Sequence, residues 1–172
     1  MDAGILTGSP PNFASALRRA SALRLDQYAQ IIAQMIETLE PLHVLDYGCG
    51  PDLALPRALA KAGLTRAFKF QFYDPDVAKY ASTPVPADVV VCLDLLNTGD
   101  DEAAEDTLDD LEALVDGVGF FAFETRSPEW WLPRIIAKFD LQTYQRVPGG
   151  SYAIVYGKPR SVIENTDGKT FT

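Results

Sequence analysis

The sequence predicts an α/β fold built on a mostly parallel sheet, and three features of the chain support that prediction. A short apolar run at 43–47 ends in a glycine turn and leads into a helical pattern from Leu53. A nearly uninterrupted apolar stretch over 87–96 is typical of a central parallel strand that is buried on both faces. Such stretches alternate along the chain with segments of helical periodicity, which is the pattern of βα units.

Length and composition indicate one globular domain. The chain has 172 residues, of which 47% are hydrophobic and 23% charged. We expect residues 1–158 to form the domain, with 1–11 as a flexible lead and 159–172 as a polar, disordered tail. No apolar run approaches the roughly 20 residues that span a membrane. The start of the chain lacks the basic and apolar regions of a signal peptide, and two cysteines are too few for a disulfide framework. We therefore expect a cytoplasmic protein.

The net charge of −9 comes from one segment. Nine of the 24 acidic residues lie between Asp100 and Asp116, where there is no Lys or Arg, and the other 15 balance the 15 basic residues. A duplex nucleic acid is therefore disfavoured as a partner, because no basic footprint is present. The segment 100–116 is expected to form a solvated helix face rather than a metal site, and it could serve as a surface for a protein partner. No metal site is predicted.

The N-terminal third is predicted to be helical. Apolar residues recur at helical spacing from Phe13 to Leu39, and a second start near Asp26 would divide this segment into two helices. Gln27 and Tyr28 could fold over a ligand as a lid, although packing in the core is the expectation for Tyr28.

The glycine turn after the first strand is the main candidate for a binding site. Gly48 and Gly50 come two and four residues after Asp46, and a helix is predicted over 53–62, ending at Gly63. A strand, a glycine turn and a helix form the usual start of a nucleotide site, because the turn and the helix N-terminus offer unpaired N–H groups. Asp74 ends the next predicted strand (67–73) and lies 24 residues after Gly50, near the spacing at which such units place a carboxylate on a ribose. The alternative is that Asp74 and Pro75 only form a turn.

A further acidic residue is expected at the same edge of the sheet. Asp94 lies at or just beyond the end of the 87–96 strand, where ligands bind in open α/β sheets, and Asn97 is close by. Turn formation explains Asp94 equally well. The segment 75–86 is short and rich in proline, so this layer of the fold is expected to be reduced.

The C-terminal half is predicted to complete the sheet. The acidic helix is expected to begin at Thr98 or Asp100 and to end at Gly117, before a buried strand over 118–123. A helix from Ser127 carries Trp130 and Trp131, which are expected in the core but could stack on a substrate. The segments 141–147 and 151–157 flank Pro-Gly-Gly and predict an antiparallel hairpin.

These motifs together resemble the class I S-adenosylmethionine-dependent methyltransferases, and more narrowly a group of short methyltransferase-like proteins of phages and proteobacteria. Three segments carry the resemblance: VLDYGCG (44–50), YDPDVAKYA (73–81) and PADVVVCLDLL (86–96). It implies a Rossmann-like three-layer sandwich, with a seven-stranded or reduced sheet that is mostly parallel and has an antiparallel last strand.

The same resemblance implies the cofactor and its contacts. S-adenosylmethionine would be bound by residues of three segments: Asp46, Tyr47, Gly48, Cys49 and Gly50; Asp74 and Pro75; and Asp94 and Leu95. Asp74 would take the ribose hydroxyls, Pro75 would lie beside the adenine, and Asp94 and Leu95 would line the methyl-donor side. Asp94 and Asn97 are the candidate catalytic residues.

Three departures from the family pattern limit the prediction of function. The fourth strand is followed by Leu95-Leu96-Asn97 rather than a Leu-Glu-His-like sequence, and only Asp88 is available as the acid that usually contacts adenine. A polar insert after the fifth strand is also missing. The leading hypothesis is a methyltransferase with a small-molecule acceptor. The alternatives are a non-catalytic protein of this fold that binds a cofactor or a partner, and a nicotinamide-dependent oxidoreductase, which the missing third glycine disfavours.

Overall fold

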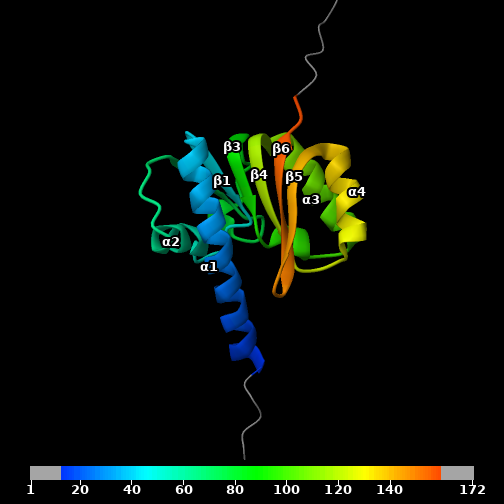
Figure 1. The fold of residues 1–172 in the computed structure, drawn as a ribbon, viewed down its shortest axis with the longest axis horizontal. Coiled ribbons are helices and arrows are strands. Elements are labelled where there is room, and N and C mark those ends of the chain that lie inside the picture. The colour runs from blue at the N-terminus through cyan, green and yellow to red at the C-terminus, as the bar shows by residue number, and fades with distance from the viewer. Residues whose placement is uncertain (1–12, 160–172) are drawn as a thin grey trace, which may run out of the picture.

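The computed structural model describes residues 13–159, with side chains from Arg24 onward. The expected lead over 1–11 and the tail beyond 159 lie outside the described residues. Figure 1 shows a central sheet flanked by helices. In chain order the elements are α1 (Phe13–Leu39), β1 (His43–Tyr47), α2 (Ala54–Lys61), β2 (Lys69–Tyr73), η1 (Ala78–Tyr80), β3 (Ala87–Cys92), η2 (Leu95–Asn97), α3 (Asp101–Leu114), β4 (Val115–Phe123), α4 (Pro128–Lys138), β5 (Phe139–Val147) and β6 (Gly150–Gly157).

The sheet has the mixed topology that the sequence predicted. Its six strands run in the order β2-β1-β3-β4-β6-β5, with β2, β1, β3 and β4 parallel. β6 is antiparallel to β4, and β5 is antiparallel to β6, so the C-terminal hairpin forms one edge. The sheet is the reduced form rather than the seven-stranded one. Between Asp74 and Pro86 the structure forms only η1 and loop, because this proline-rich segment is too short for another strand and helix.

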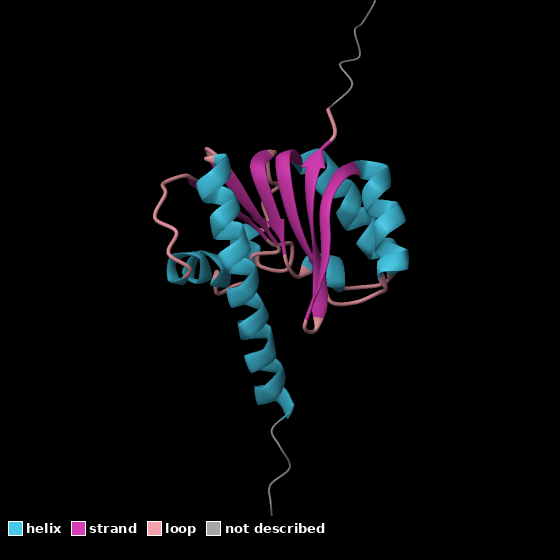
Figure 2. Cartoon of the chain, in the orientation of Figure 1, coloured by secondary structure: helices cyan, strands magenta, loops and turns pink. Residues whose placement is uncertain are grey.

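Two helical layers enclose the sheet (Figure 2). One core cluster joins α1 and α2 to one face, and a second joins α3 and α4 to the other. Val90 and Val91 in the middle of β3 are completely buried, one in each cluster, which confirms β3 as a central strand covered on both sides. The domain is thus a three-layer α/β sandwich. No helix among residues 13–159 is long and apolar enough to cross a membrane.

Several element boundaries differ from those predicted. The N-terminal helix is one continuous α1 without a break at Asp26. The acidic helix α3 is capped by Asp100, whose Oδ1 accepts a hydrogen bond from Ala103 N, but it ends at Leu114. Gly117 therefore does not end the helix. It lies inside β4, where a Cβ atom would be 2.5 Å from the carbonyl oxygen of Asp88.

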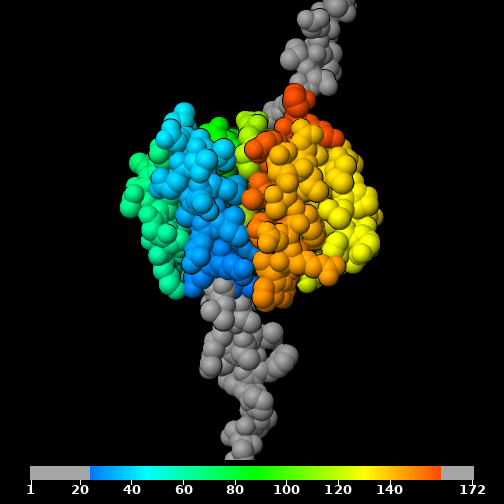
Figure 3. All heavy atoms as spheres, in the orientation of Figure 1, coloured from blue at the N-terminus to red at the C-terminus, as the bar shows by residue number. Residues whose placement is uncertain are grey.

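Helix α1 and the C-terminal hairpin lie side by side. In Figure 3 the described part of α1 is in contact with β5 and β6 across the surface of the molecule. At this contact, a Cβ atom on Gly149 of the hairpin turn would be 2.7 Å from a guanidinium nitrogen of Arg24. The close fit brings the N-terminal half of α1 to the same end of the sheet as the glycine turn.

Candidate active site

Three acidic side chains meet at the carboxyl ends of the parallel strands. Asp46 is the fourth of five residues in β1, Asp74 directly follows β2, and Asp94 comes two residues after β3. Because parallel strands end at one edge of the sheet, residues that are far apart in sequence come together there. Asp46 and Asp74 are buried, which is unusual for carboxylates and marks this edge as a candidate site.

The glycine turn is fixed to the end of β2 by backbone hydrogen bonds. The N–H groups of Gly48 and Cys49 donate to the carbonyl oxygen of Tyr73 at 2.7 and 3.0 Å. Gly50 N donates to Oδ2 of Asp74 at 2.9 Å, and Asp76 N donates to its Oδ1 at 3.0 Å. Asp74 therefore forms a turn, as the alternative interpretation expected, and also holds the glycine segment in place. Each of its oxygens keeps a lone pair for a further donor.

Two cavities open over this edge of the sheet. The first has a volume of about 220 Å³, and its lining residues come from α1, β1, the glycine turn, α2 and the ends of β3 and β4: Arg24, Leu25, Tyr28, Asp46, Gly48, Cys49, Ala54, Leu55, Leu93, Asp94 and Glu124. The second, of about 580 Å³, lies over β2 and η1 and is lined by Gly48, Gly50, Pro51, Asp74, Asp76, Val77, Ala78, Asp94, Leu95 and Thr98. Gly48 and Asp94 line both, so the two cavities adjoin.

The first cavity contains a carboxylate without a hydrogen-bond donor. Oδ2 of Asp46 is buried and has no partner among the described residues. Burial raises the pKa of Asp46 to about 7, and the neighbouring Asp94 and Asp74 contribute to the shift. The pKa of Asp94 is also raised, first by burial and then by Glu124 and Asp74. Such a cluster destabilises its own negative charges, so it favours a ligand that brings positive charge or hydrogen-bond donors.

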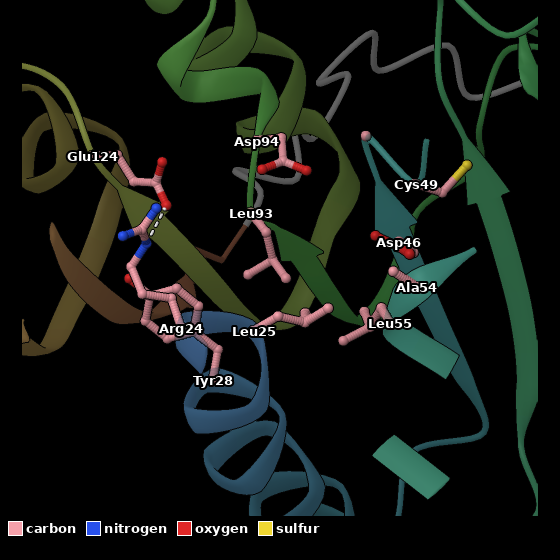
Figure 4. A pocket seen from close by; sticks show the side chains of 11 residues that line it. Arg24, Leu25, Tyr28, Asp46, Cys49, Ala54, Leu55, Leu93, Asp94 and Glu124 are labelled. Carbon is pink, nitrogen blue, oxygen red and sulfur yellow. Dashed lines mark hydrogen bonds and ion pairs between the residues drawn. The ribbon is translucent and has the colours of Figure 1, made fainter. Parts of the chain in front are cut away.

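The other side of the first cavity is built by α1 and the end of β4. Figure 4 shows Arg24, Tyr28 and Glu124 together, opposite Asp46 and Cys49, with Asp94 between them. Arg24 Nε donates to Oε1 of Glu124 at 2.8 Å. The hydroxyl of Tyr28 is buried and has no hydrogen-bond partner among residues 24–159. Sequence reasoning missed Arg24 and Glu124. Glu124 directly follows a parallel strand and could have been found by the rule that identified Asp94.

The other predicted site residues have different surroundings. Tyr47 points to the opposite face of the sheet, where its hydroxyl donates to Asp110 Oδ2 at 2.9 Å. Pro75 is exposed and lines neither cavity. Cys49 lines the first cavity, and burial raises the pKa of its thiol to about 11, so the thiol is not ionised at neutral pH. Leu95 packs directly over Gly48, where a Cβ atom would be 2.8 Å from Leu95 Cγ.

Two residues considered from sequence are engaged in structural bonds. Asp88 is the second residue of β3, so it lies at the amino end of the parallel strands, whereas the cavities lie at their carboxyl ends. Its carboxylate accepts hydrogen bonds from Leu42 N and His43 N. The expectation that Asp88 could contact adenine is therefore wrong. Trp131 is completely buried, and its Nε1 donates to the carbonyl oxygen of Thr125 at 2.8 Å, which confirms core packing.

The acids of α3 are largely paired within the molecule. Arg134 bonds Glu105, Lys138 bonds Asp109 and Glu112, and Arg126 bonds Asp101. These contacts connect α3 to α4 and the loop before it, and they neutralise part of the acidic face. No group of three or more His, Cys, Asp or Glu residues in the described part of the chain is arranged to hold a metal ion.

Comparison with known proteins identifies the fold. No family model matches the sequence, and no curated protein matches it. Among solved structures, magnesium protoporphyrin IX methyltransferase from Synechocystis PCC 6803 with bound S-adenosylmethionine is 17% identical, with a TM-score of 0.62 over 88% of this chain and 86% of that chain. The 1,6-didemethyltoxoflavin-N1-methyltransferase of Burkholderia thailandensis is 17% identical, with a TM-score of 0.55 over 92% and 94% of the two chains.

A third match is to a protein whose name gives a different kind of methyl acceptor. The 16S rRNA methylase RmtB is 17% identical, with a TM-score of 0.53 over 77% of this chain and 64% of that chain. The fold of this protein is thus that of the class I S-adenosylmethionine-dependent methyltransferases. Since proteins of this fold act on both small molecules and RNA, the acceptor must be argued from the site itself.

Proposed function

We propose that this chain is an S-adenosylmethionine-dependent methyltransferase with a small-molecule acceptor. The observation that carries the proposal is the buried, unpartnered Oδ2 of Asp46 beside a glycine turn, at the carboxyl edge of a sheet of this fold. The residues present suit the cofactor. A carboxylate cluster suits its sulfonium and ammonium groups, and the left-handed Gly48 and Gly50, with φ of 93° and 66°, permit close approach of the backbone.

The two cavities suggest how the cofactor is divided between them. The second cavity would hold the adenosine part, with the remaining lone pairs of Asp74 accepting from the ribose hydroxyls. The adenine would extend past this lining toward the exposed Pro75, which borders neither cavity. The first cavity would hold the methionine end, with Asp46 and Gly48 on one side and Asp94 and Leu95 at the junction with the second cavity.

In the proposed reaction the cofactor supplies an electrophilic methyl group on a sulfonium. The protein's contribution is to align the acceptor with that methyl group and to receive a proton where the acceptor must lose one. Asp94 is the proposed proton-accepting residue, because its carboxylate lines both cavities. Asn97 is proposed as a positioning residue.

A small acceptor is supported by the dimensions and charge of the site. The first cavity has a volume of only about 220 Å³ and contains three carboxylates, which would repel a nucleic-acid backbone. The acidic face of α3 is largely paired within the molecule, and no contact in the structure favours a protein partner there. We also propose a cytoplasmic location, since Cys49 and Cys92 are both free.

Calorimetry with S-adenosylmethionine, S-adenosylhomocysteine and NAD tests the proposal. We expect both sulfur ligands to bind and NAD not to bind. Asp74→Ala should weaken binding by about 1–3 kcal/mol, the contribution of hydrogen bonds to a charged group. Asp106→Ala, on the exposed face of α3, is the matched control and should bind as the wild type does. A folded protein that binds neither sulfur ligand would overturn the proposed function.

A further inference from the structure

We infer that the methyl acceptor is an amine, which enters the first cavity on the side formed by Arg24, Tyr28 and Glu124. This inference rests on the proposed function and deepens it, because it names the chemical class of the acceptor. It is carried by the charge balance of the cavity and by a buried hydroxyl without a partner, both of which belong to the described residues.

The charge balance of the first cavity favours a cationic acceptor. Its ionisable carboxylates are Asp46, Asp94 and Glu124, and its one guanidinium is that of Arg24, which is already paired with Glu124. With all of them ionised the lining carries two net negative charges. S-adenosylmethionine has one net positive charge, so the loaded cavity still carries one negative charge. A protonated amine would neutralise it.

The apolar part of the lining increases this preference. Leu25, Leu55 and Leu93 lie among the charged groups, and Leu55 is almost fully buried. Electrostatic interactions are stronger in such surroundings than in water, because less solvent screens them. An acceptor with a carboxylate or phosphate would meet uncompensated negative charge. An amine on an apolar skeleton would contact both the carboxylates and the leucine side chains of the lining.

The hydroxyl of Tyr28 offers the hydrogen bond that an amine requires. It is buried without a partner, and a buried polar group without a partner is destabilising. The hydroxyl lies close to the hairpin turn, since a Cβ atom on Gly150 would be 3.3 Å from it. One N–H group of a bound amine would donate to the Tyr28 oxygen, while the amine lies in the cavity that Asp94 also lines.

The reaction then balances without any further reagent. The bound ammonium gives one proton to the Asp94 carboxylate and becomes a neutral amine with a free lone pair. That pair attacks the methyl carbon, the new N–C bond forms, and the electrons of the broken C–S bond pass to sulfur, which becomes a neutral thioether. The methylated nitrogen then carries the positive charge. The product leaves either as this ammonium ion or, after losing a proton, as the neutral amine. Burial raises the pKa of Asp94, so its carboxylate accepts a proton more readily than an exposed one.

A hydroxyl acceptor suits the cavity less well. An alcohol or phenol becomes strongly nucleophilic on losing its proton, and this creates an oxyanion beside Asp94 and Glu124. A site built for an oxyanion presents hydrogen-bond donors or cations to it. Here Arg24 is the one cation of the lining, and its Nε is engaged with Glu124.

The inference can be tested by binding measurements on the protein saturated with S-adenosylhomocysteine. The probes are primary amines from ethylamine to tryptamine, together with the alcohols and carboxylates of the same carbon skeletons, titrated by calorimetry or by NMR. We expect at least one amine to bind ten-fold or more tightly than its alcohol and its carboxylate. With S-adenosylmethionine carrying a labelled methyl group, that amine should also become labelled.

Substitutions of residues that line the first cavity test whether the amine binds there. Asp94→Asn and Tyr28→Phe should each weaken binding of the preferred amine at least five-fold, with circular dichroism showing a folded protein. For Tyr28→Phe, S-adenosylhomocysteine binding should persist. Glu102→Gln, on the exposed face of α3, is the control and should leave amine binding unchanged. If S-adenosylhomocysteine binds but no amine is preferred over its alcohol or carboxylate, the inference is overturned and the proposed function stands. If S-adenosylhomocysteine does not bind, the proposed function is overturned, and the inference that rests on it is overturned as well.

Discussion

The side-chain oxygen of Asn97 accepts a hydrogen bond from the backbone N–H of Glu124 at 2.7 Å. The amide nitrogen of Asn97 donates to the carbonyl oxygens of Leu93 and Ala122, at 3.1 and 3.2 Å. One side chain thus joins the end of β3 to the end of β4, beside the cavity that both strands line. These bonds fix the backbone that carries Asp94 and Glu124 beside the cavity.

Replacing Asn97 with alanine should lower the free energy of unfolding by about 1–3 kcal/mol, because three backbone groups at the ends of β3 and β4 lose their partners, and two of these bonds are partly buried. Urea denaturation followed by circular dichroism measures the change. Gln30→Ala, at an exposed position of α1, is the control and should change stability by less than about 0.5 kcal/mol. Equal stability of the two variants would show that the three hydrogen bonds of Asn97 make no net contribution to the free energy of unfolding.

A methyl group at position 48 should be less well tolerated than one at position 63. Gly48 and Gly63 have nearly the same positive φ, 93° and 92°. A Cβ atom on Gly48 would be 2.8 Å from Leu95 Cγ, whereas a Cβ atom on Gly63 would have no neighbour within 4 Å. Gly63→Ala therefore measures the backbone cost alone, roughly 1–2 kcal/mol. Gly48→Ala should cost more, and we expect Leu95→Ala to recover the difference in a double-mutant cycle. Equal costs for the two alanines would contradict the packing of Leu95 over Gly48.

The ion pairs between α3 and α4 should contribute little to stability. Lys138 bonds both Asp109 and Glu112, but the side chains of these acids are 61% and 49% exposed and are screened by water. Lys138→Met, which keeps the aliphatic stem, should lower the free energy of unfolding by no more than about 1 kcal/mol. The difference from the wild type should shrink further in 1 M NaCl, which urea denaturation at two salt concentrations can measure. A loss of several kcal/mol would mean that these pairs hold the two helices together.

The sequence predicted the part of the site that follows from strand topology. Asp46, Asp74 and Asp94 each come at or after the end of a parallel strand, so their placement at one edge of the sheet followed from the pattern of apolar runs. The fold class followed in the same way, as did the hairpin from its Pro-Gly-Gly turn. These features depend on residues that are close together in the chain or on a general rule of parallel sheets.

The other half of the site could not be predicted, because it depends on how distant elements pack. Arg24 and Tyr28 line the cavity from α1, and Gly149 and Gly150 of the hairpin turn lie close against these two side chains. The bonds of Asn97 connect residues up to 27 positions apart, and no local pattern encodes them. The boundary at Gly117 was missed for a different reason. β4 begins at Val115 directly after α3. Gly117 therefore allows β4 to approach Asp88 of β3 closely and does not end a helix.

The burial of Asp46 should make the stability of the protein depend on pH around neutrality. Its pKa is raised from 3.8 to about 7 in the folded state, so between these values the folded protein binds more protons than the unfolded chain. The free energy of unfolding therefore falls as the pH rises through this window, and the loss is complete above the folded-state pKa. A tenfold difference in proton affinity corresponds to about 1.4 kcal/mol, so the loss is at most about 4 kcal/mol.

Asp46→Asn should remove this dependence, because asparagine has nearly the shape of the protonated side chain and does not ionise. Urea midpoints of the two proteins at pH 5.5 and pH 8.5 measure the effect, and the variant should gain stability relative to the wild type at the higher pH. Asp106→Asn corrects for the loss of one negative charge, since Asp106 is exposed on α3. If the wild type and Asp46→Asn respond to pH in parallel, Asp46 is ionised throughout the range, and its buried oxygen must have a partner in solution.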